Sequence, residues 1–293
     1  MLSHLVILQD NAMQNLQAQK GAVFRDLHTS DDIFVMPNAW NAGSACMLES
    51  AGFSAIGTTS AGIAYCLGVP DYEGALSRDA ALEETRRIAM AVNVPVGAGA
   101  ENGYGHDPSE VAESIRLFAE AGAVGASIED YAASFGGTLY EQHHAVDRIR
   151  AAREAADSLG FAFTLTARSE CYLIGHPDPF EESVVRANLY REAGADCLFV
   201  PGVKDADTIE SLATEIAGPT NVVMGLAGTP LSVPELKDLG VKRVSIGGSL
   251  ARTTFGTIRR AAEEIRDQGT FGFAEAQVPD DELCRFFSAR ARA

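Results

Sequence analysis

The residues best suited to chemistry in this sequence are five carboxylates and one arginine that follow short apolar runs. They are Asp71, Glu101, Glu129, Asp130, Glu170 and Arg168. Carboxylates that converge on one point repel each other unless they share protons or bind a cation. A hard divalent ion that takes oxygen ligands, Mg²⁺ or else Mn²⁺, is therefore the expected cofactor.

Arg168 is the positive group of this set. A guanidinium binds a carboxylate through two parallel hydrogen bonds, so Arg168 is predicted to hold a carboxylate of the substrate. With the metal it describes a site for a small 2-oxo or 2-hydroxy acid, in which the metal stabilises a developing enolate oxygen. Taken singly, each acid is explained equally well as a helix N-cap or as an ion-pair partner of Arg168. Their occurrence at successive strand ends favours the site.

A recurring phrase indicates which elements must position these residues. It occurs as AGFSAIGTTS (51–60), AGAVGASIED (121–130), AGADCLFVPG (193–202) and LGVKRVSIGG (239–248). In each copy a glycine that can cap a helix precedes an apolar run, and polar or glycine-rich residues follow. The run has the length of a strand that is buried on both faces, so the polar residues lie at the carboxyl end of a strand.

Four further strand candidates lie between these phrases, at 33–40, 95–103, 161–170 and 221–228. Amphipathic helical stretches separate the strands, at 77–92, 108–121, 144–159, 179–193, 205–216, 233–239 and 249–267. Eight strands that alternate with about eight helices indicate parallel βαβ units and an α/β (β/α)8 TIM barrel. A doubly wound open sheet is the alternative, but it would need a GxGxxG after the first strand, and the sequence has none.

This pattern predicts three parts: an N-terminal extension or helix over 1–30, the barrel over 31–268 and a C-terminal helical tail over 269–293. The tail carries four phenylalanines, Phe271, Phe273, Phe286 and Phe287. Aromatic side chains on a tail must find a surface. Packing on the tail's own barrel and docking on a neighbouring subunit are equally consistent with them.

In a TIM barrel the active site lies at the carboxyl ends of the strands. We therefore predict three groups of site residues from their positions after the strands. The catalytic group is Arg168, Glu129 and Tyr65; the substrate-binding group is Thr58, Thr59, Ser60, Arg168 and Trp40; the metal ligands are Asp71, Glu101 and Glu129. Thr59 and Ser60 are also explained as residues that simply end a strand.

Composition narrows the class of protein. The chain of 293 residues has 23 basic and 40 acidic side chains, a formal charge of 23 − 40 = −17. This charge argues against nucleic acid and against a basic membrane-surface protein. We expect a cytoplasmic protein, because the sequence shows neither a long apolar span nor a signal peptide, and its five cysteines are scattered singly.

The sequence resembles the isocitrate lyase/phosphoenolpyruvate mutase superfamily over residues 33 to 268. The segments that carry the resemblance are, in order, PNAWNAGSA, AGFSAIGTTSAGIAYCLGVPD, GAENGYGHDP, AGAVGASIED, TLTARSE and GVKRVSIGGSLAR. The resemblance implies a (β/α)8 barrel, a Mg²⁺ ion, a 2-oxo acid or oxyanion intermediate, and a homotetramer that exchanges C-terminal helices between subunits.

The resemblance also implies roles by position. Thr59 and Ser60 match the family's substrate-binding segment after strand two, and Arg168 matches the arginine that holds the substrate. Asp71, Glu101 and Glu129 match carboxylates of the metal shell.

Two segments depart from the family pattern. The position of the family's direct metal ligand, the first Asp of Asp-x-Asp/Glu-x-Gly, is Gly99 here. The segment EDYAASFGGTLYEQHHA (129–145) has neither the Lys-Lys/Arg-Cys-Gly-His of the lyase branches nor the Lys and Asn-Ser of the mutase branch. Gly136 and Gly137 still suit a gating loop.

These observations predict a Mg-dependent carbon–carbon lyase or decarboxylase that acts on a small 2-oxo or 2-hydroxy di- or tricarboxylic acid. A phosphonopyruvate-type P–C mutase or hydrolase is the first alternative. A barrel that binds a 2-oxo acid with weakened catalysis is the second.

Overall fold

The computed structural model describes residues 2–71, 74–133, 136–226 and 230–290, with side chains from residue 14 onward. The chain divides into two compact units, one that ends at Ala251 and one that begins at Arg252. Each unit is described by itself.

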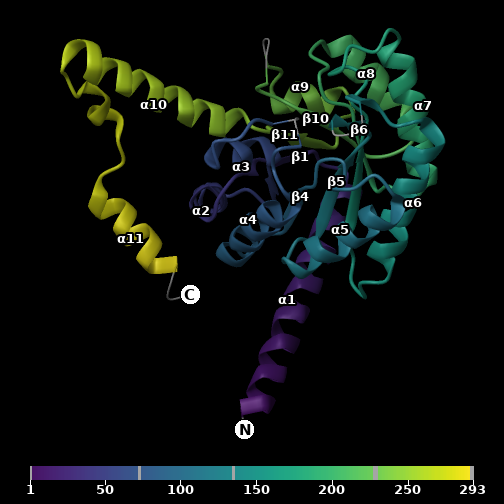
Figure 1. The fold of residues 1–293 in the computed structure, drawn as a ribbon, viewed down its shortest axis with the longest axis horizontal. Helices are drawn as coiled ribbons and strands as arrows, with labels where there is room; N and C mark the ends of the chain where they lie inside the picture. Colours follow the sequence, from purple (N-terminus) through teal and green to yellow (C-terminus); the bar gives the residue numbers. More distant parts are fainter. Residues whose placement is uncertain (1, 72–73, 134–135, 227–229, 291–293) are drawn as a thin grey trace. The chain divides into compact units, whose positions relative to one another are not determined.

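The first unit is a parallel barrel, with its strands in the middle and helices around them (Figure 1). Its strands are β1 (Phe34–Met36), β2 (Asn38–Ala39), β3 (Ile56–Thr58), β4 (Val96–Gly99), β5 (Gly125–Glu129), β8 (Thr164–Arg168), β9 (Cys197–Phe199), β10 (Thr220–Val223) and β11 (Arg243–Ser245). Their hydrogen-bonded order is β1-β11-β10-β9-β8-β5-β4-β3-β2.

The barrel closes through the first strand, which Pro37 divides into β1 and β2. Proline has no N–H to give to a neighbouring strand. β1 pairs with β11 and β2 pairs with β3, so the two pieces fill one position between them. The described strands thus occupy eight positions, and the predicted (β/α)8 barrel is confirmed.

Helices follow the strands as the sequence pattern predicts. Those of the first unit are α1 (Leu2–Thr29), α2 (Ala42–Ser50), α3 (Ser60–Cys66), α4 (Arg78–Ala91), α5 (Pro108–Glu120), α6 (Gln142–Asp157), α7 (Pro179–Glu192), α8 (Ala206–Glu215) and α9 (Val233–Asp238). Local chemistry starts many of them: Asn41 and Ser232 form capping boxes, and prolines occupy the first turns of α5 and α7. α2 and α3 are not among the helical stretches that the sequence pattern predicts.

Glycines line much of the barrel interior, where branched side chains usually fill the space. Gly97 and Gly125 give room to the ring of Phe24, which enters from α1: a Cβ at Gly125 would lie 2.7 Å from its Cε1. Above this ring a cavity of about 110 Å³ extends to the carboxyl ends of the strands. The N-terminal helix therefore closes the barrel floor.

A small hairpin follows β5, in the segment predicted to gate the site. β6 (Tyr131–Ala132) pairs antiparallel with β7 (Thr138–Leu139). Gly136 and Gly137 have φ values of 96° and 67°, which favour glycine.

The second unit contains most of α10 (Ser249–Gln268), the 3₁₀ helix η2 (Gly272–Ala276) and α11 (Asp280–Arg290). Phe271, Phe273 and Phe287 are exposed within it. What these rings pack against in solution stays a prediction. No helix in the described part of the chain has the length and apolar character to cross a membrane.

Candidate active site

The main cavity opens at the carboxyl ends of the strands, where Arg168 lies among carboxylates. Its lining there includes Thr58, Ser60, Glu129 and Arg168. Nη1 of Arg168 lies 2.9 Å from Oε1 of Glu129, and Nε contacts Oε1 of Glu170. All three side chains are largely buried. The arginine that was predicted to hold substrate therefore already binds two carboxylates.

The carboxyl groups around Arg168 have pKa values raised to near neutral pH. Burial raises the pKa of Glu129 to about 7 against the opposing charge of Arg168, and Glu101 and Asp71 raise it further. Burial likewise raises the pKa of Glu170 to about 8. Burial and the charge of Asp71 raise the pKa of Glu101 to about 7. Groups with such values can both accept and donate a proton at neutral pH, as general acid–base catalysis requires.

The loop after β4 holds Glu101 in a strained conformation. Glu101 and Tyr104 have φ values of 44° and 56°, in the left-handed region that side chains other than glycine rarely adopt. Strain of this kind persists only where the surroundings impose it, and it is common at functional sites. The backbone of Glu101 is also tied to β5, because its carbonyl accepts a 2.8 Å hydrogen bond from the N–H of Glu129.

Arg148 of α6 holds that loop in place through hydrogen bonds to its carbonyls. Its guanidinium donates to the carbonyls of Gly105 and His106 at 2.7 and 2.6 Å, and also to the carbonyl of Asn102. It lies over the ring of Tyr140, 3.9 Å from the centroid. Loop residues 102–106 are thus fixed by three charge-assisted hydrogen bonds.

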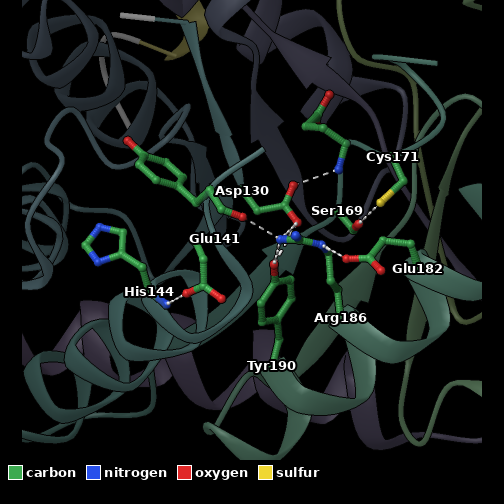
Figure 2. Close-up of polar contacts among 10 residues, drawn as sticks. Asp130, Glu141, His144, Ser169, Cys171, Glu182, Arg186 and Tyr190 are labelled. Carbon is green, nitrogen blue, oxygen red and sulfur yellow. Dashed lines mark hydrogen bonds and ion pairs between the residues drawn. The ribbon is translucent and has the colours of Figure 1, made fainter. Parts of the chain in front are cut away.

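Asp130 forms an ion pair with a different arginine, Arg186 (Figure 2). Its carboxylate accepts from the N–H of Glu170 at 2.8 Å, from the hydroxyl of Tyr190 at 2.7 Å and from Nη1 of Arg186 at 3.3 Å. The expectation that Asp130 joins the carboxylates at the mouth is wrong, because successive strand residues point to opposite faces. Glu129 faces the cavity and Asp130 faces α7.

The Asp130 network anchors both ends of the hairpin. Nη1 of Arg186 also donates to the carbonyl of Tyr140 at 3.0 Å, and the N–H of Tyr140 donates to the carbonyl of Asp130 at 2.8 Å. Figure 2 shows the guanidinium between Asp130, Tyr190 and Glu182. One buried arginine, Arg186, therefore fixes the base of the β6–β7 hairpin.

Comparison with known proteins agrees with this geometry. The profile of the family described as phosphoenolpyruvate phosphomutase matches residues 24–266. The chain belongs to this family. The resemblance to the isocitrate lyase/phosphoenolpyruvate mutase superfamily is confirmed.

Three similar proteins illustrate the range of the superfamily. A solved structure from Burkholderia cenocepacia J2315, assigned as a lyase or mutase, is 48% identical with a TM-score of 0.90, covering 94% of this chain and 97% of that one. The 2-methylisocitrate lyase of Aeropyrum pernix is 28% identical over 85% of this chain and 81% of its own. A phosphonopyruvate hydrolase structure with oxalate and Mg²⁺ is 26% identical with a TM-score of 0.81, covering 93% and 96%.

The family's metal residues partly converge in this chain. Asp71, Glu101 and Glu129 line one small cavity beside Ser60. Among the described residues no three His, Cys, Asp or Glu side chains lie close enough together to chelate a metal ion. Crowded carboxylates with raised pKa values suit a hard cation, so the donor set fits a largely hydrated Mg²⁺ and not one that is bound directly by three side chains.

The predicted substrate-binding residues have mixed positions. Thr58 accepts a 2.9 Å hydrogen bond from the N–H of Gly99, and Thr59 N-caps α3. Ser60 lines both the main and the small cavity. Trp40 packs against the hydrophobic core, and Tyr65 lies beside Gly248 at the mouth. The roles of these five residues stay predictions.

The site depends on residues that the sequence reasoning missed: Arg148, Arg186 and Tyr190. A signal for them exists in the helical spacing. Arg148 occupies a buried position of α6 beside Ala145 and Ile149, and Arg186 occupies one of α7 beside Ser183 and Tyr190. A charged residue on the apolar face of a helix indicates a buried partner.

Proposed function

We propose that this chain is a carbon–carbon lyase that acts on a small 2-oxo or 2-hydroxy dicarboxylic acid. The observation that carries the proposal is Arg168, held at the cavity mouth between Glu129 and Glu170, whose pKa values are raised to about 7 and about 8. This arrangement combines carboxylate binding with proton transfer. Similarity to a 2-methylisocitrate lyase supports it.

The chain's own residues would divide the work as follows. Arg168 binds a substrate carboxylate. Glu170, once protonated, no longer pairs with Arg168 and so leaves its guanidinium available to the substrate. Ionised Glu129 takes the proton of the 2-hydroxyl group. The C–O bond becomes a carbonyl, the neighbouring C–C bond breaks, and its electron pair passes to the departing acid as an enolate. Tyr65, beside Gly248, is the candidate that returns a proton to that carbon.

Asp71, Glu101 and Glu129 would hold a Mg²⁺ or Mn²⁺ ion, chiefly through water. When bound, the ion supplies positive charge where the enolate oxygen develops. The hairpin over β6 and β7 lies beside this cavity, since Tyr131 and Ala133 contribute to its lining. Its closure would exclude water from the reacting groups.

A screen of 2-oxo and 2-hydroxy acids tests the proposal, with and without Mg²⁺ and read by formation of pyruvate or glyoxylate. On the substrate found, Arg168→Lys should raise KM and lower kcat because it loses the two-point geometry. Arg153→Lys is the matched control, since Arg153 pairs with Asp157 and Asp196 away from the cavity. Unchanged kinetics for Arg168→Lys would contradict the carboxylate-binding role of Arg168.

A phosphorus–carbon reaction is the second candidate, favoured by the similarity to a phosphonopyruvate hydrolase. Phosphate release from phosphonopyruvate, together with no turnover of any carbon acid, would decide for it. Stabilisation of the fold by 2-oxo acids without turnover of either class would identify a binding protein instead.

We further propose that the chain acts as a cytoplasmic homo-oligomer whose exposed tail rings pack on a second copy. Phe271 and Phe287 are 64% and 40% exposed, which is unusual for large aromatic side chains. Sedimentation analysis of the full chain and of Phe287→Asp tests this. A monomeric wild-type chain would refute it.

A further inference from the structure

The floor of the barrel holds an arginine that has no acidic partner among the residues the structure describes. Arg243, the first residue of β11, is only 3% exposed. No carboxylate forms an ion pair with it in the described part of the chain, and burial lowers its pKa without opposition from any carboxylate. A charge buried without a counter-charge destabilises the fold strongly. A function for Arg243 is therefore needed to explain it.

The partners of Arg243 are all neutral acceptors. Nε donates to Oδ1 of Asn221 at 2.8 Å, and Nη1 donates to Nε2 of His28 at 2.9 Å and to Oγ1 of Thr166 at 3.2 Å. Burial and the charge of Arg243 lower the pKa of His28 to about 3, so this ring is neutral and its Nδ1–H donates to the carbonyl of Phe24. These three hydrogen bonds use Nε and Nη1, so among the described residues the two N–H groups of Nη2 remain for a ligand.

A second group without a hydrogen-bond partner lines the same cavity. The hydroxyl of Ser127 is buried and has no hydrogen-bond partner within the described ranges. Ser127 is level with Thr166 in the sheet, and Thr166 contacts Arg243. Ser127 and Arg243 line the same cavity. Two unsatisfied donors of independent origin therefore border one space.

That space continues to the candidate active site. The cavity that contains Arg243 also contains Arg168 and Glu129. Thr166 and Arg168 lie on the same face of β8, and alternate residues of a parallel strand are about 6.6 Å apart. Gly99, level with Ser127, leaves the interior open between the two layers, because it adds no side chain. A short carboxylate can reach the floor from the mouth.

We propose that Nη2 of Arg243 and the hydroxyl of Ser127 form a carboxylate subsite at the barrel floor, one layer below Arg168. Its ligand is either the far carboxylate of a dicarboxylic substrate or a separate small carboxylate. The first case rests on the proposed function and extends it, because it selects dicarboxylic over monocarboxylic acids. Asn221 orients the guanidinium, since its amide N donates to Oγ of Ser245 at 3.0 Å and leaves its carbonyl for Arg243.

The test measures the dissociation constants of formate, oxalate and malonate by thermal stabilisation at fixed ionic strength. The proteins are wild type, Arg243→Gln, Arg168→Gln, the double variant and, as the matched control, Arg153→Gln. We expect Arg243→Gln to weaken carboxylate binding by about 10- to 100-fold, the usual effect of losing hydrogen bonds to a charged group. Arg153→Gln should bind as wild type does.

The pattern identifies the source of the carboxylate. If one dicarboxylate spans both arginines, malonate is affected by each single variant and the double variant adds little, while formate binds weakly throughout. If a separate carboxylate occupies the floor, formate depends on Arg243 and not on Arg168. Either pattern supports the subsite, and neither requires turnover, so failure of the lyase proposal leaves the result interpretable.

Equal affinities of wild type and Arg243→Gln for all three acids would overturn the subsite. Arg243→Lys, which keeps the charge, replaces the glutamine variant if that protein does not fold. A crystal structure of the wild-type chain with malonate gives an independent answer. A carboxylate on Nη2 of Arg243 supports the proposal, and water alone there contradicts it.

Discussion

The two arginines inside the barrel, Arg168 at the mouth and Arg243 at the floor, have opposite surroundings. Arg168 contacts Glu129 and Glu170, with Glu101 and Asp71 nearby. Arg243 contacts an amide, a neutral imidazole and a hydroxyl. The mouth therefore has an excess of acidic groups over basic ones, and the floor has a positive charge without an acidic group.

This difference explains how an acidic protein can accept an anionic ligand. The chain's charge of −17 describes the whole sequence, whereas a ligand inside the barrel responds to the nearest groups. A cation at the mouth and an anion at the floor would each neutralise the local excess. A metal ion and a carboxylic acid fit this polarity together.

The largest effect should come from removing the arginine at the mouth. Arg168→Met leaves Glu129 and Glu170 buried without a cation, and breaking a buried pair in this way costs about 3–5 kcal/mol of unfolding free energy. Urea titration at about pH 8.5, where both carboxylates tend to ionise, measures it. Arg243→Met removes a buried charge that has no counter-charge, which stabilises, but it leaves the acceptors of Asn221, His28 and Thr166 without a donor, which destabilises. Because these effects oppose each other, it should cost clearly less unfolding free energy than Arg168→Met in carboxylate-free buffer. Equal losses in the two variants would show that the arginines are equivalent.

A third arginine tests whether neutral acceptors alone can hold a buried guanidinium. Within the described residues Arg148, like Arg243, contacts no acidic side chain, but three loop carbonyls accept hydrogen bonds from it. Arg148→Met leaves these carbonyls without a donor and should cost about 2–3 kcal/mol. It should also lower kcat more than it raises KM, because the loop carries Glu101. Arg148→Lys should restore part of both, and malonate affinity should be unchanged.

Most of the scaffold could be predicted from the sequence, whereas the floor could not. Strand and helix periodicity reports burial along the chain, so the barrel and the placing of Glu101, Glu129 and Arg168 at strand ends followed from local patterns. Arg243 lies in the run VKRVSIGG, where its alternation with Ser245 gives no sign of facing a cavity. Its environment is made by His28, Thr166 and Asn221, which are far apart in sequence. Only the closed barrel brings them together.

The same limit explains Asp130 and Glu129. The sequence places the two acids side by side, and strand geometry alone sends one to Arg168 and the other to Arg186. Recognising that required the inward face of β5 to be known, which depends on the pairing of that strand with β4 and β8.

The pH dependence of stability measures the excess negative charge at the mouth. Glu101 and Glu129 have folded-state pKa values of about 7, above the ordinary value of 4.5, and Glu170 of about 8. The folded chain therefore binds more protons than the unfolded chain between about pH 5 and pH 8, and its unfolding free energy falls as pH rises through this window. We expect a loss of at most about 5 kcal/mol from about pH 6 to pH 8 in urea titrations with EDTA, the value if the three carboxyl groups titrate independently. Glu101→Gln and Glu129→Gln should each flatten the profile, and a flat wild-type profile would contradict the crowding of carboxylates.

The smallest effect should come from placing a carboxylate between the two arginines. Gly99 lines the cavity between the mouth and the floor, and a Cβ there would have the carbonyl oxygen of Thr58 as its nearest contact, at 3.3 Å. This contact is tighter than usual, so Gly99→Asp requires the backbone at Thr58 to move slightly, and Gly99→Asn carries the same strain. The new acid adds a hard oxygen ligand at the mouth and a negative charge above Arg243, so it should strengthen Mn²⁺ binding and weaken malonate binding, each by about tenfold or less. Calorimetric titration of both ligands into Gly99→Asp and into Gly99→Asn, which adds the same volume without the charge, separates charge from size. Opposite changes in the two affinities that vanish in the asparagine variant would show that one interior cavity couples the acidic mouth to the basic floor; parallel changes would show that the two regions respond only to the volume of the side chain.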